Sequence, residues 1–370
     1  MRYYVIAGEA SGDLHASNLI SGLKKQDPAA EFRAWGGDLM AAQGAALVKH
    51  YRDLAFMGFM EVLLNLKTIL GNLRVCRRDI LEWKPDVVIL VDYPGFNLRM
   101  AKFAARHHFR VFYYISPQVW AWHASRVKTI RRYVERMFVI LPFEQDFYRK
   151  HHYGVDFAGH PLLDAIGETG QTAARFRSES GLGSQPLIAL LPGSRKQEIV
   201  RMLPVMLQVI PLFPQYRFVV AALSSIPPEC YEKIVGGVET VVVTDRTHDL
   251  LRNAAAALVT SGTATLEAAL LNTPQVVCYK AGVVSYWIAR MLVDVKFISL
   301  VNLIAGRQVV KELLQYDLRK ENLAKELSLI LEEDRSRKIR EDYAELRTRL
   351  GGKGASSRIA ALMAQYLQSK

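Results

Sequence analysis

The sequence predicts an α/β protein with two doubly wound domains, each built on a mainly parallel sheet. Short runs of β-branched and aromatic residues alternate with longer segments of helical periodicity. This alternation occurs in two series, separated by a stretch rich in Gly and Pro. The length of 370 residues is sufficient for two domains that each bury a core. In such Rossmann-like domains ligands bind at the carboxyl ends of the strands, so we expect a ligand cleft between the two sheets.

The first series of strands defines a domain expected over residues 1–165. Its predicted strands are residues 3–7, 31–35, 87–91, 111–115 and 137–140. The alternation loosens over residues 157–183, where Gly159, Pro161, Gly167 and Gly170 accompany small polar residues. We therefore place the domain boundary in this stretch.

The second series defines a domain expected over residues 166–349. Its predicted strands are residues 187–191, 218–222, 240–243, 257–260 and 275–279. From residue 321 onward the pattern is helical and highly charged, and Gly351, Gly352 and Gly354 separate the last helix from the preceding one. Residues 350–370 are expected to return to the N-terminal domain or to pack on a partner subunit.

Composition limits the class of protein. The N-terminal apolar run is too short for a signal-peptide core, and no uninterrupted apolar stretch approaches the roughly 18 residues of a membrane-spanning helix. The three cysteines are far apart and form no CxxC pair, which favours a reducing, cytoplasmic compartment. The net charge of +12 favours anionic partners such as phosphorylated substrates or lipid headgroups, and no nucleic-acid-binding motif is present.

A strand–turn–helix segment in the second domain is the first candidate phosphate site. A Ser-Gly turn follows the strand at 257–260, so the free N–H groups and positive dipole of the next helix would face the ligand. Glu267, one turn into the helix, is expected to accept hydrogen bonds from ribose hydroxyls. The residues expected to bind the nucleotide here are Ser261, Gly262, Thr263, Ala264, Thr265 and Glu267. An ordinary capped turn with a solvated glutamate is the alternative.

A second turn of the same layout, with the sequence PGSR, follows the strand at 187–191. Ser194 and Arg195 would lie at the same edge of the sheet. A guanidinium offers a bidentate fork to a diphosphate and stays charged, so Arg195 is expected to stabilise a phosphate leaving group. A lone Arg beside a turn is more often a surface residue, but two such turns in one domain favour a nucleotide diphosphate site.

Asp92 follows a buried strand of the first domain, in the segment VVILVDYPGFN. A carboxylate at the end of a central strand faces the ligand edge rather than the core. Beside an acceptor hydroxyl, and opposite a sugar diphosphate, Asp92 is expected to act as the general base for direct displacement at the anomeric carbon. An Asp that only caps the following turn is the alternative.

The segment GEASGD follows the first strand. Gly8 and Gly12 permit a tight backbone, and Glu9, Ser11 and Asp13 are expected to bring polar groups to the ligand edge. The segment contains neither the GK[ST] of a phosphate-binding loop nor the GxGxxG of a dinucleotide-binding turn. A sugar or acceptor contact and simple helix capping are the two interpretations.

No metal and no cofactor are expected. The histidines form no HExxH pattern, and the adjacent pairs at 107–108 and 151–152 would point in different directions on any regular element. The paired tryptophans of SPQVWAWH, at 120 and 122, could line a sugar or lipid pocket, although such aromatics more often pack in a core.

The segment AFMGFMEVLLNLKTILGN, residues 55–72, predicts a helix with an unusually broad apolar surface. Its polar residues form one narrow stripe, and apart from Lys67 the remaining circumference is apolar. Burial on all sides is one interpretation. Contact with lipid is the other, and the basic residues that follow favour an anionic membrane surface. The residues expected to contact lipid are Phe56, Met57, Phe59, Met60, Leu63, Leu64 and Leu66.

A series of motifs, taken in order, resembles the lipid-A-disaccharide synthase family. They are GEASGD, AFMGFMEVL, VDYPGFN, ISPQVWAW, LPFE, GHPLLD, LPGSR, SGTATLEAAL and NLIAGRQVVKELLQ, and they extend from residue 8 to about residue 315. The resemblance implies an inverting, two-domain glycosyltransferase of the GT-B type, active in lipopolysaccharide biosynthesis. Such enzymes join UDP-2,3-diacylglucosamine to 2,3-diacylglucosamine 1-phosphate and release UDP, so the UDP-sugar is a substrate and not a cofactor.

The resemblance also implies roles for individual residues. Asp92 matches the family's proposed base, Arg195 a diphosphate contact, and residues 262–267 the UDP site, while Asn302 and Arg307 resemble further active-site residues. A homodimer with exchanged C-terminal segments, peripheral on the inner membrane, is implied as well.

Two departures and two competing functions remain open. Tyr93 and Gly95 stand where other members often carry different residues, which leaves the details of acceptor fit undecided. A UDP-sugar epimerase of similar fold would explain the phosphate turns but not the apolar helix. A membrane adaptor would explain the helix but not the turns.

Overall fold

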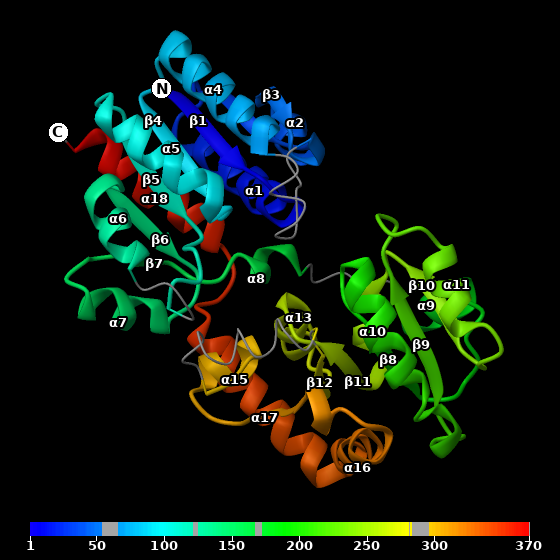
Figure 1. Ribbon diagram of the computed structural model, residues 1–370. Helices are drawn as coiled ribbons and strands as arrows, with labels where there is room; N and C mark the ends of the chain where they lie inside the picture. Colours follow the sequence, from blue (N-terminus) through cyan, green and yellow to red (C-terminus); the bar gives the residue numbers. More distant parts are fainter. Residues whose placement is uncertain (54–65, 121–124, 167–171, 281, 283–295, 370) are drawn as a thin grey trace. The chain divides into compact units, whose positions relative to one another are not determined.

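The computed structural model describes residues 1–53, 66–120, 125–166, 172–280, 282 and 296–369. The chain divides into two compact units, Met1–Asp164 together with Leu350–Lys370, and Ala165–Arg349. Each unit contains one parallel sheet with helices on both of its faces (Figure 1). The prediction of two doubly wound α/β domains is confirmed.

The first unit is built on a 7-stranded sheet of order β3-β2-β1-β4-β5-β6-β7. The central strand β4 reads VVILV and is buried along its whole length, as expected for a parallel strand covered on both faces. The strands are β1 Arg2–Ala7, β2 Glu31–Gly36, β3 Ala46–His50, β4 Val87–Val91, β5 Arg110–Tyr114, β6 Arg136–Val139 and β7 Asp156–Phe157.

Two groups of helices cover this sheet. Apolar side chains of α1, α2 and α18 form one core with one face of the sheet, and those of α4 to α7 form a second core with the other face. The helices are α1 Ala10–Gln26, α2 Asp38–Ala42, α4 Leu66–Trp83, α5 Pro94–Arg106, α6 Arg126–Tyr133, α7 Phe143–Lys150, α8 Leu162–Ala165 and α18 Ala355–Gln368, with a 3₁₀ turn at Tyr51–Asp53.

The C-terminal helix α18 packs on α1 of the same chain (Figure 1). Gly22 permits this close approach, because a Cβ there would lie 2.8 Å from the Cβ of Ala360. Asp164 fixes the start of α18 by accepting hydrogen bonds from the backbone N–H groups of Gly354 (2.6 Å) and Ser356 (2.9 Å). The last segment of the chain is therefore part of the first unit.

The second unit is built on a 6-stranded sheet of order β10-β9-β8-β11-β12-β13. Helices α9, α12 and α13 share a core with one face, and α10 and α16 contact the central strands as well. The strands are β8 Leu187–Leu191, β9 Arg217–Ala222, β10 Val241–Thr244, β11 Ala254–Thr260, β12 Gln275–Tyr279 and β13 Lys311–Leu314. The helices are α9 Ala173–Glu179, α10 Lys196–Leu207, α11 Glu229–Val235, α12 Thr247–Asn253, α13 Thr263–Leu270, α15 Leu300–Ala305, α16 Lys320–Leu331 and α17 Glu333–Arg349, with 3₁₀ turns at Ile210–Leu212 and Gln315–Asp317.

Within the described part of the chain, no helix combines the length and the apolar character needed to cross a bilayer.

Candidate active site

Three turns lie side by side at the carboxyl edge of the first sheet. Strand β4 pairs with β1 and with β5, and Val91 at its end is opposite Ala7 and Tyr114. Because the strands are parallel, the segments that follow them all begin at this edge. Glu9 and Asp92 thereby lie at the same edge, where the negative charge of Glu9 acts on the Asp92 carboxyl.

Asp92 has an uncommon backbone conformation. Its φ is +44° and that of Tyr93 is +49°, so two consecutive residues with side chains lie in the left-handed region that favours glycine. The backbone N–H of Asp92 donates to the carbonyl of Tyr114 (3.1 Å). Its carbonyl accepts from the Tyr113 hydroxyl (2.6 Å) and from the Asn97 amide (2.7 Å). These contacts compensate the cost of the conformation.

The Asp92 carboxyl has a raised pKa. Burial is the main cause, the negative charge of Glu9 adds to it, and together they outweigh a hydrogen bond from the backbone of Tyr93 and raise the pKa to about 6. The group is ionised at neutral pH, yet it is a stronger base than an ordinary aspartate. This is the property that a general base requires.

The residues of the GEASGD segment have two different roles, packing against neighbouring backbone and side chains and presenting polar groups beside Asp92. Gly8 packs under the Tyr93 ring, and a Cβ there would lie 2.4 Å from Cγ of that ring. Glu9 is partly exposed beside Asp92, and Ser11 is exposed in the first turn of α1. Asp13 also lies at this edge of the first sheet, but its carboxylate binds backbone groups of the chain. It is buried, and it accepts hydrogen bonds from three backbone N–H groups at the start of α2.

The Ser-Gly turn after β11 offers backbone N–H groups. Gly262 is the N-cap of α13, and no side chain caps the helix there. A Cβ at Gly262 would meet no atom within 4 Å, so the space above this helix end is open. The hydroxyl of Thr265 bonds to the carbonyl of Gly262 (2.8 Å) and is part of the buried turn, while Thr263 and Ala264 form the first residues of the helix. Uncapped N–H groups at a helix N-terminus suit a phosphate.

The PGSR turn after β8 differs from the Ser-Gly turn in how its backbone N–H groups are bonded. Strand β8 neighbours β11, with Leu191 opposite Val259, so both turns lie at the same edge of the second sheet. The Glu198 carboxylate accepts hydrogen bonds from the N–H groups of Ser194 (3.0 Å) and Arg195 (3.3 Å). Two donors of this turn are therefore already satisfied by an anion of the chain itself.

The Arg195 guanidinium lies 3.4 Å from a Glu198 oxygen, and its side chain is 60% exposed. Such an exposed pair is weak, and it leaves most of the five guanidinium donors available to a diphosphate.

Glu267 lines a cavity at the same edge of the second sheet. The cavity has a volume of about 450 Å³, and the residues after β9 and β10, including Leu223 and Asp245, also line it. A ring nitrogen of His248 lies 3.2 Å from Oε2 of Glu267. The pair provides polar groups suited to ribose hydroxyls, and His248 was not among the residues predicted from the sequence.

Asn302 and Arg307 are both engaged within the second unit. Asn302 is fully buried, and its Oδ1 accepts hydrogen bonds from the N–H groups of Val309 (2.7 Å) and Val310 (3.0 Å). Arg307 makes a bidentate contact with Asp342, 3.0 Å for each bond. Asn302 therefore fixes the loop that follows α15, and Arg307 connects that loop to α17.

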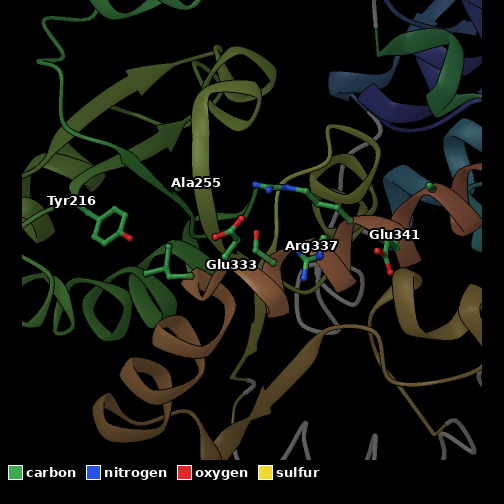
Figure 2. A pocket seen from close by; sticks show the side chains of 9 residues that line it. Tyr216, Ala255, Glu333, Arg337 and Glu341 are labelled. Atoms are coloured by element: carbon green, nitrogen blue, oxygen red, sulfur yellow. The ribbon is translucent and has the colours of Figure 1, made fainter.

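A second cavity of the same unit lies at the opposite edge of the sheet. It has a volume of about 700 Å³ and is lined by Ala255 at the start of β11, by Tyr216 just before β9, and by residues of α17. Figure 2 shows Tyr216, Ala255, Glu333, Arg337 and Glu341 around it. It contains none of the predicted site residues, and the amino ends of parallel strands are not the usual place for ligands.

The remaining predictions concern metal and lipid. Across the residues that the structure covers, no group of three or more His, Cys, Asp or Glu side chains could hold a metal ion. Leu66 begins α4, and the other predicted lipid contacts, at positions 56, 57, 59, 60, 63 and 64, lie outside the described residues.

Comparison with known proteins identifies the family. The family model described as lipid-A-disaccharide synthetase matches residues 3–366. The lipid-A-disaccharide synthases of Syntrophus aciditrophicus (strain SB) and Myxococcus xanthus (strain DK1622) are each 40% identical over 374 residues, covering 99% of this chain and 97% of the relative. The chain belongs to the lipid-A-disaccharide synthase family. It is therefore a glycosyltransferase, as the motifs predicted.

Solved structures share the fold of this lipid-A-disaccharide synthase family member. The UDP-GlcNAc 2-epimerase from Neisseria meningitidis bound to UDP-GlcNAc has a TM-score of 0.72 at 12% identity, covering 99% of this chain and 100% of that one. The glycotransferase of kitacinnamycin has a TM-score of 0.67 at 14% identity, covering 99% of both chains. One fold thus carries epimerases and transferases, and the epimerase alternative has only this likeness in its favour.

Sequence reasoning missed several residues that organise the site of this synthase family member. Glu198 occupies the third position of α10, where an acidic residue after a polar turn predicts a cap, so a capping pattern could have identified it. Tyr113 and His248 gave no such signal, because their partners are 21 and 19 residues away along the chain.

Proposed function

We propose that this glycosyltransferase joins UDP-2,3-diacylglucosamine to 2,3-diacylglucosamine 1-phosphate, forming the lipid A disaccharide 1-phosphate and UDP. The observation that supports it best is the Asp92 carboxylate, which lies at the carboxyl edge of a parallel sheet with its pKa raised to about 6. Family membership favours the two diacyl sugars as substrates.

In the proposed reaction Asp92 removes the proton from the acceptor hydroxyl. The hydroxyl oxygen then attacks the anomeric carbon of the donor while the bond from that carbon to UDP breaks, which inverts the configuration. The proton remains on Asp92 and the electron pair leaves with UDP. A base with a raised pKa accepts this proton more readily, and it is still ionised at neutral pH.

We assign the departing UDP to the second unit. The uncapped start of α13 at Gly262 supplies N–H groups and the positive end of a helix dipole, which stabilise a diphosphate as its charge develops. Arg195 adds a guanidinium from the neighbouring turn. Glu267, oriented by His248, would accept hydrogen bonds from the ribose.

Asn302 is proposed to act on the UDP turn indirectly. The hydroxyl of Ser261 donates to the carbonyl of Ile298 (3.1 Å), and the N–H of Ile298 donates to Glu312 (3.0 Å). The Asn302 amide also donates to Glu312 (2.8 Å). This connected set of hydrogen bonds holds Ser261 in place. Arg307 would restrain the same loop through Asp342.

Attachment to an anionic membrane surface is part of the proposal. Helix α4 exposes the apolar side chains of Leu70, Val75 and Leu81, with Lys67 and Arg74 exposed among them. A mixed apolar and basic helix face is typical of interfacial binding. Replacing Leu70 and Val75 by Ser should reduce flotation with anionic vesicles while the thermal transition stays intact, because both side chains face solvent.

We also propose that the protein forms the homodimer that the resemblance implies. It would act on the cytoplasmic side of the inner membrane and bind no nucleic acid. Light scattering of the purified protein measures the oligomeric state. A monomer at all concentrations would contradict it.

The test of the function is product analysis. Purified protein is incubated with both diacyl sugars, and the products are identified by mass spectrometry together with released UDP. The expected result is a disaccharide 1-phosphate and one UDP per product. The matched control is Asp92→Asn, which should bind UDP normally and form little product. Epimerised UDP-sugar without a disaccharide would contradict the proposal and favour the epimerase alternative.

A further inference from the structure

We propose that Tyr113 is a positioning residue for the base, and that its hydroxyl, together with the Asn97 amide, holds the Asp92 backbone so that the carboxylate keeps one direction. The inference rests on the proposed role of Asp92 as the base. Tyr113 belongs to none of the motifs that identify the family, and it is fully buried, so it does not contact a substrate.

The peptide groups on both sides of the Asp92 Cα are fixed. The preceding group donates its N–H to the carbonyl of Tyr114 (3.1 Å). The following group accepts from the Tyr113 hydroxyl (2.6 Å) and from Nδ2 of Asn97 (2.7 Å). When both flanking peptide groups are held, the direction of the Cα–Cβ bond is determined, and with it the region that the carboxylate can reach.

The restraint is needed because the conformation is unfavourable. Asp92 and Tyr93 have φ values of +44° and +49°, a region in which a Cβ is crowded by the neighbouring carbonyl oxygen. Without donors on its carbonyl, the peptide between these residues could rotate toward a common conformation and turn the carboxylate away. Residues in such conformations persist where the surroundings fix them, and they cluster at active sites.

The Tyr113 hydroxyl is a dependable donor. Burial raises its pKa well above the usual value, and the nearby Asp92 charge raises it further, so the hydroxyl keeps its proton throughout the range in which the enzyme would be assayed. Asn97 supplies the second restraint, and its amide also donates to the carbonyl of Val91 (3.1 Å). The two donors come from different elements, β5 and α5, and converge on one carbonyl oxygen.

The test compares Tyr113→Phe with Tyr114→Phe. Each removes one buried hydroxyl and keeps the ring, and the two side chains point to opposite faces of β5 and belong to different cores. Tyr113→Phe is expected to lower kcat by about 10- to 100-fold, the scale of a 1 Å misplacement of a catalytic group, with KM for both sugars and UDP affinity within about twofold of the parent. Tyr114→Phe should keep the parent kcat.

Thermal transitions of both variants are recorded, and kinetics are measured well below the lower midpoint, so that partial unfolding does not enter the comparison. A parent-like kcat for Tyr113→Phe, a raised KM at unchanged kcat, or an equal loss in Tyr114→Phe would overturn the positioning role. Asp92→Asn is assayed alongside. If it turns over normally, the base assignment fails and the inference fails with it, whereas a low rate in Asp92→Asn beside a normal rate in Tyr113→Phe overturns the inference alone.

Discussion

Glu9→Gln tests whether the neighbouring charge tunes the base. Asp92 must be ionised to accept a proton, so turnover should fall as the pH drops through the Asp92 pKa, by about tenfold per pH unit at the low end. With that pKa at about 6, the acid limb of the rate profile should lie near pH 6. Glutamine keeps the size of the Glu9 side chain and removes its negative charge.

The size of the effect follows from the two causes of the shift. The pKa rises from an ordinary 3.8 to about 6, and burial contributes more of this rise than Glu9 does. Removing the Glu9 charge therefore lowers the pKa of Asp92 by less than burial raises it, so the pKa stays above 3.8. The acid limb should move to lower pH by the same amount.

The assay is UDP release at saturating concentrations of both sugars, measured from pH 4.5 to 8.5. The readout is the pH at which the acid limb of the rate profile lies, and not the maximal rate. Glu9 is also a candidate substrate contact, so its replacement could change the maximal rate for another reason. Glu9→Asp serves as the control, since it keeps the charge and should leave the limb closer to that of the parent. A limb that stays in place in Glu9→Gln, or moves to higher pH, would refute the electrostatic coupling.

Two further predictions concern glycines of the two turns in the second unit. Gly262→Ala should weaken UDP binding more than tenfold in calorimetry with an unchanged thermal midpoint, because the added Cβ meets open space where the phosphate would lie. Gly193→Ala should instead lower the midpoint, since φ there is +119° and the Cβ would lie 2.5 Å from Oε2 of Glu198.

Asp92→Asn should reduce turnover by about 10²- to 10⁴-fold. It should also stabilise the fold by on the order of 1 kcal/mol in chemical denaturation above pH 6 and not near pH 4, because the raised pKa destabilises the fold progressively from pH 3.8, where the unfolded carboxyl ionises, to about pH 6, where the folded one does. EDTA should leave activity unchanged, since the helix end at α13 and Arg195 can stabilise the leaving UDP, and a strict requirement for added magnesium or manganese would contradict this.

The central strands could be predicted from the sequence, and three edge strands could not. Strands such as β4 and β8 are short continuous apolar runs because they are buried on both faces. Strands β3, β7 and β13 lie at the edges and are only partly buried, so their sequences do not differ from those of loops. Strand β5 ends one residue earlier than predicted, because Ile115 has a φ of +64° and leaves the sheet.

The site was predictable as a set of turns but not in its internal contacts. The patterns after β8 and β11 look equivalent in the sequence, yet Glu198 satisfies the N–H groups of the first turn and the second is uncapped. Which turn offers its donors depends on Glu198 at the third position of α10, where α13 has Thr265, a difference that only a helix-capping pattern reveals. Asn302 similarly stands in a motif beside Arg307, and only its full burial distinguishes a loop-fixing role from a substrate contact.

The acidic residues at the turns and helix ends differ in what their carboxylates bind. Those of Asp13, Asp164 and Glu198 each accept two or more backbone N–H groups, which fixes a turn or a helix end. At Asp92 burial and the charge of Glu9 outweigh the backbone hydrogen bond, and the pKa rises. Burial also raises the pKa of Glu144, in the LPFE motif, to about 7, but its carboxylate accepts the N–H groups of Ile140 and Leu141 and so holds the start of α7. Proton transfer is therefore expected at Asp92, while the carboxylates bound to backbone N–H groups hold turns and helix ends within their own units.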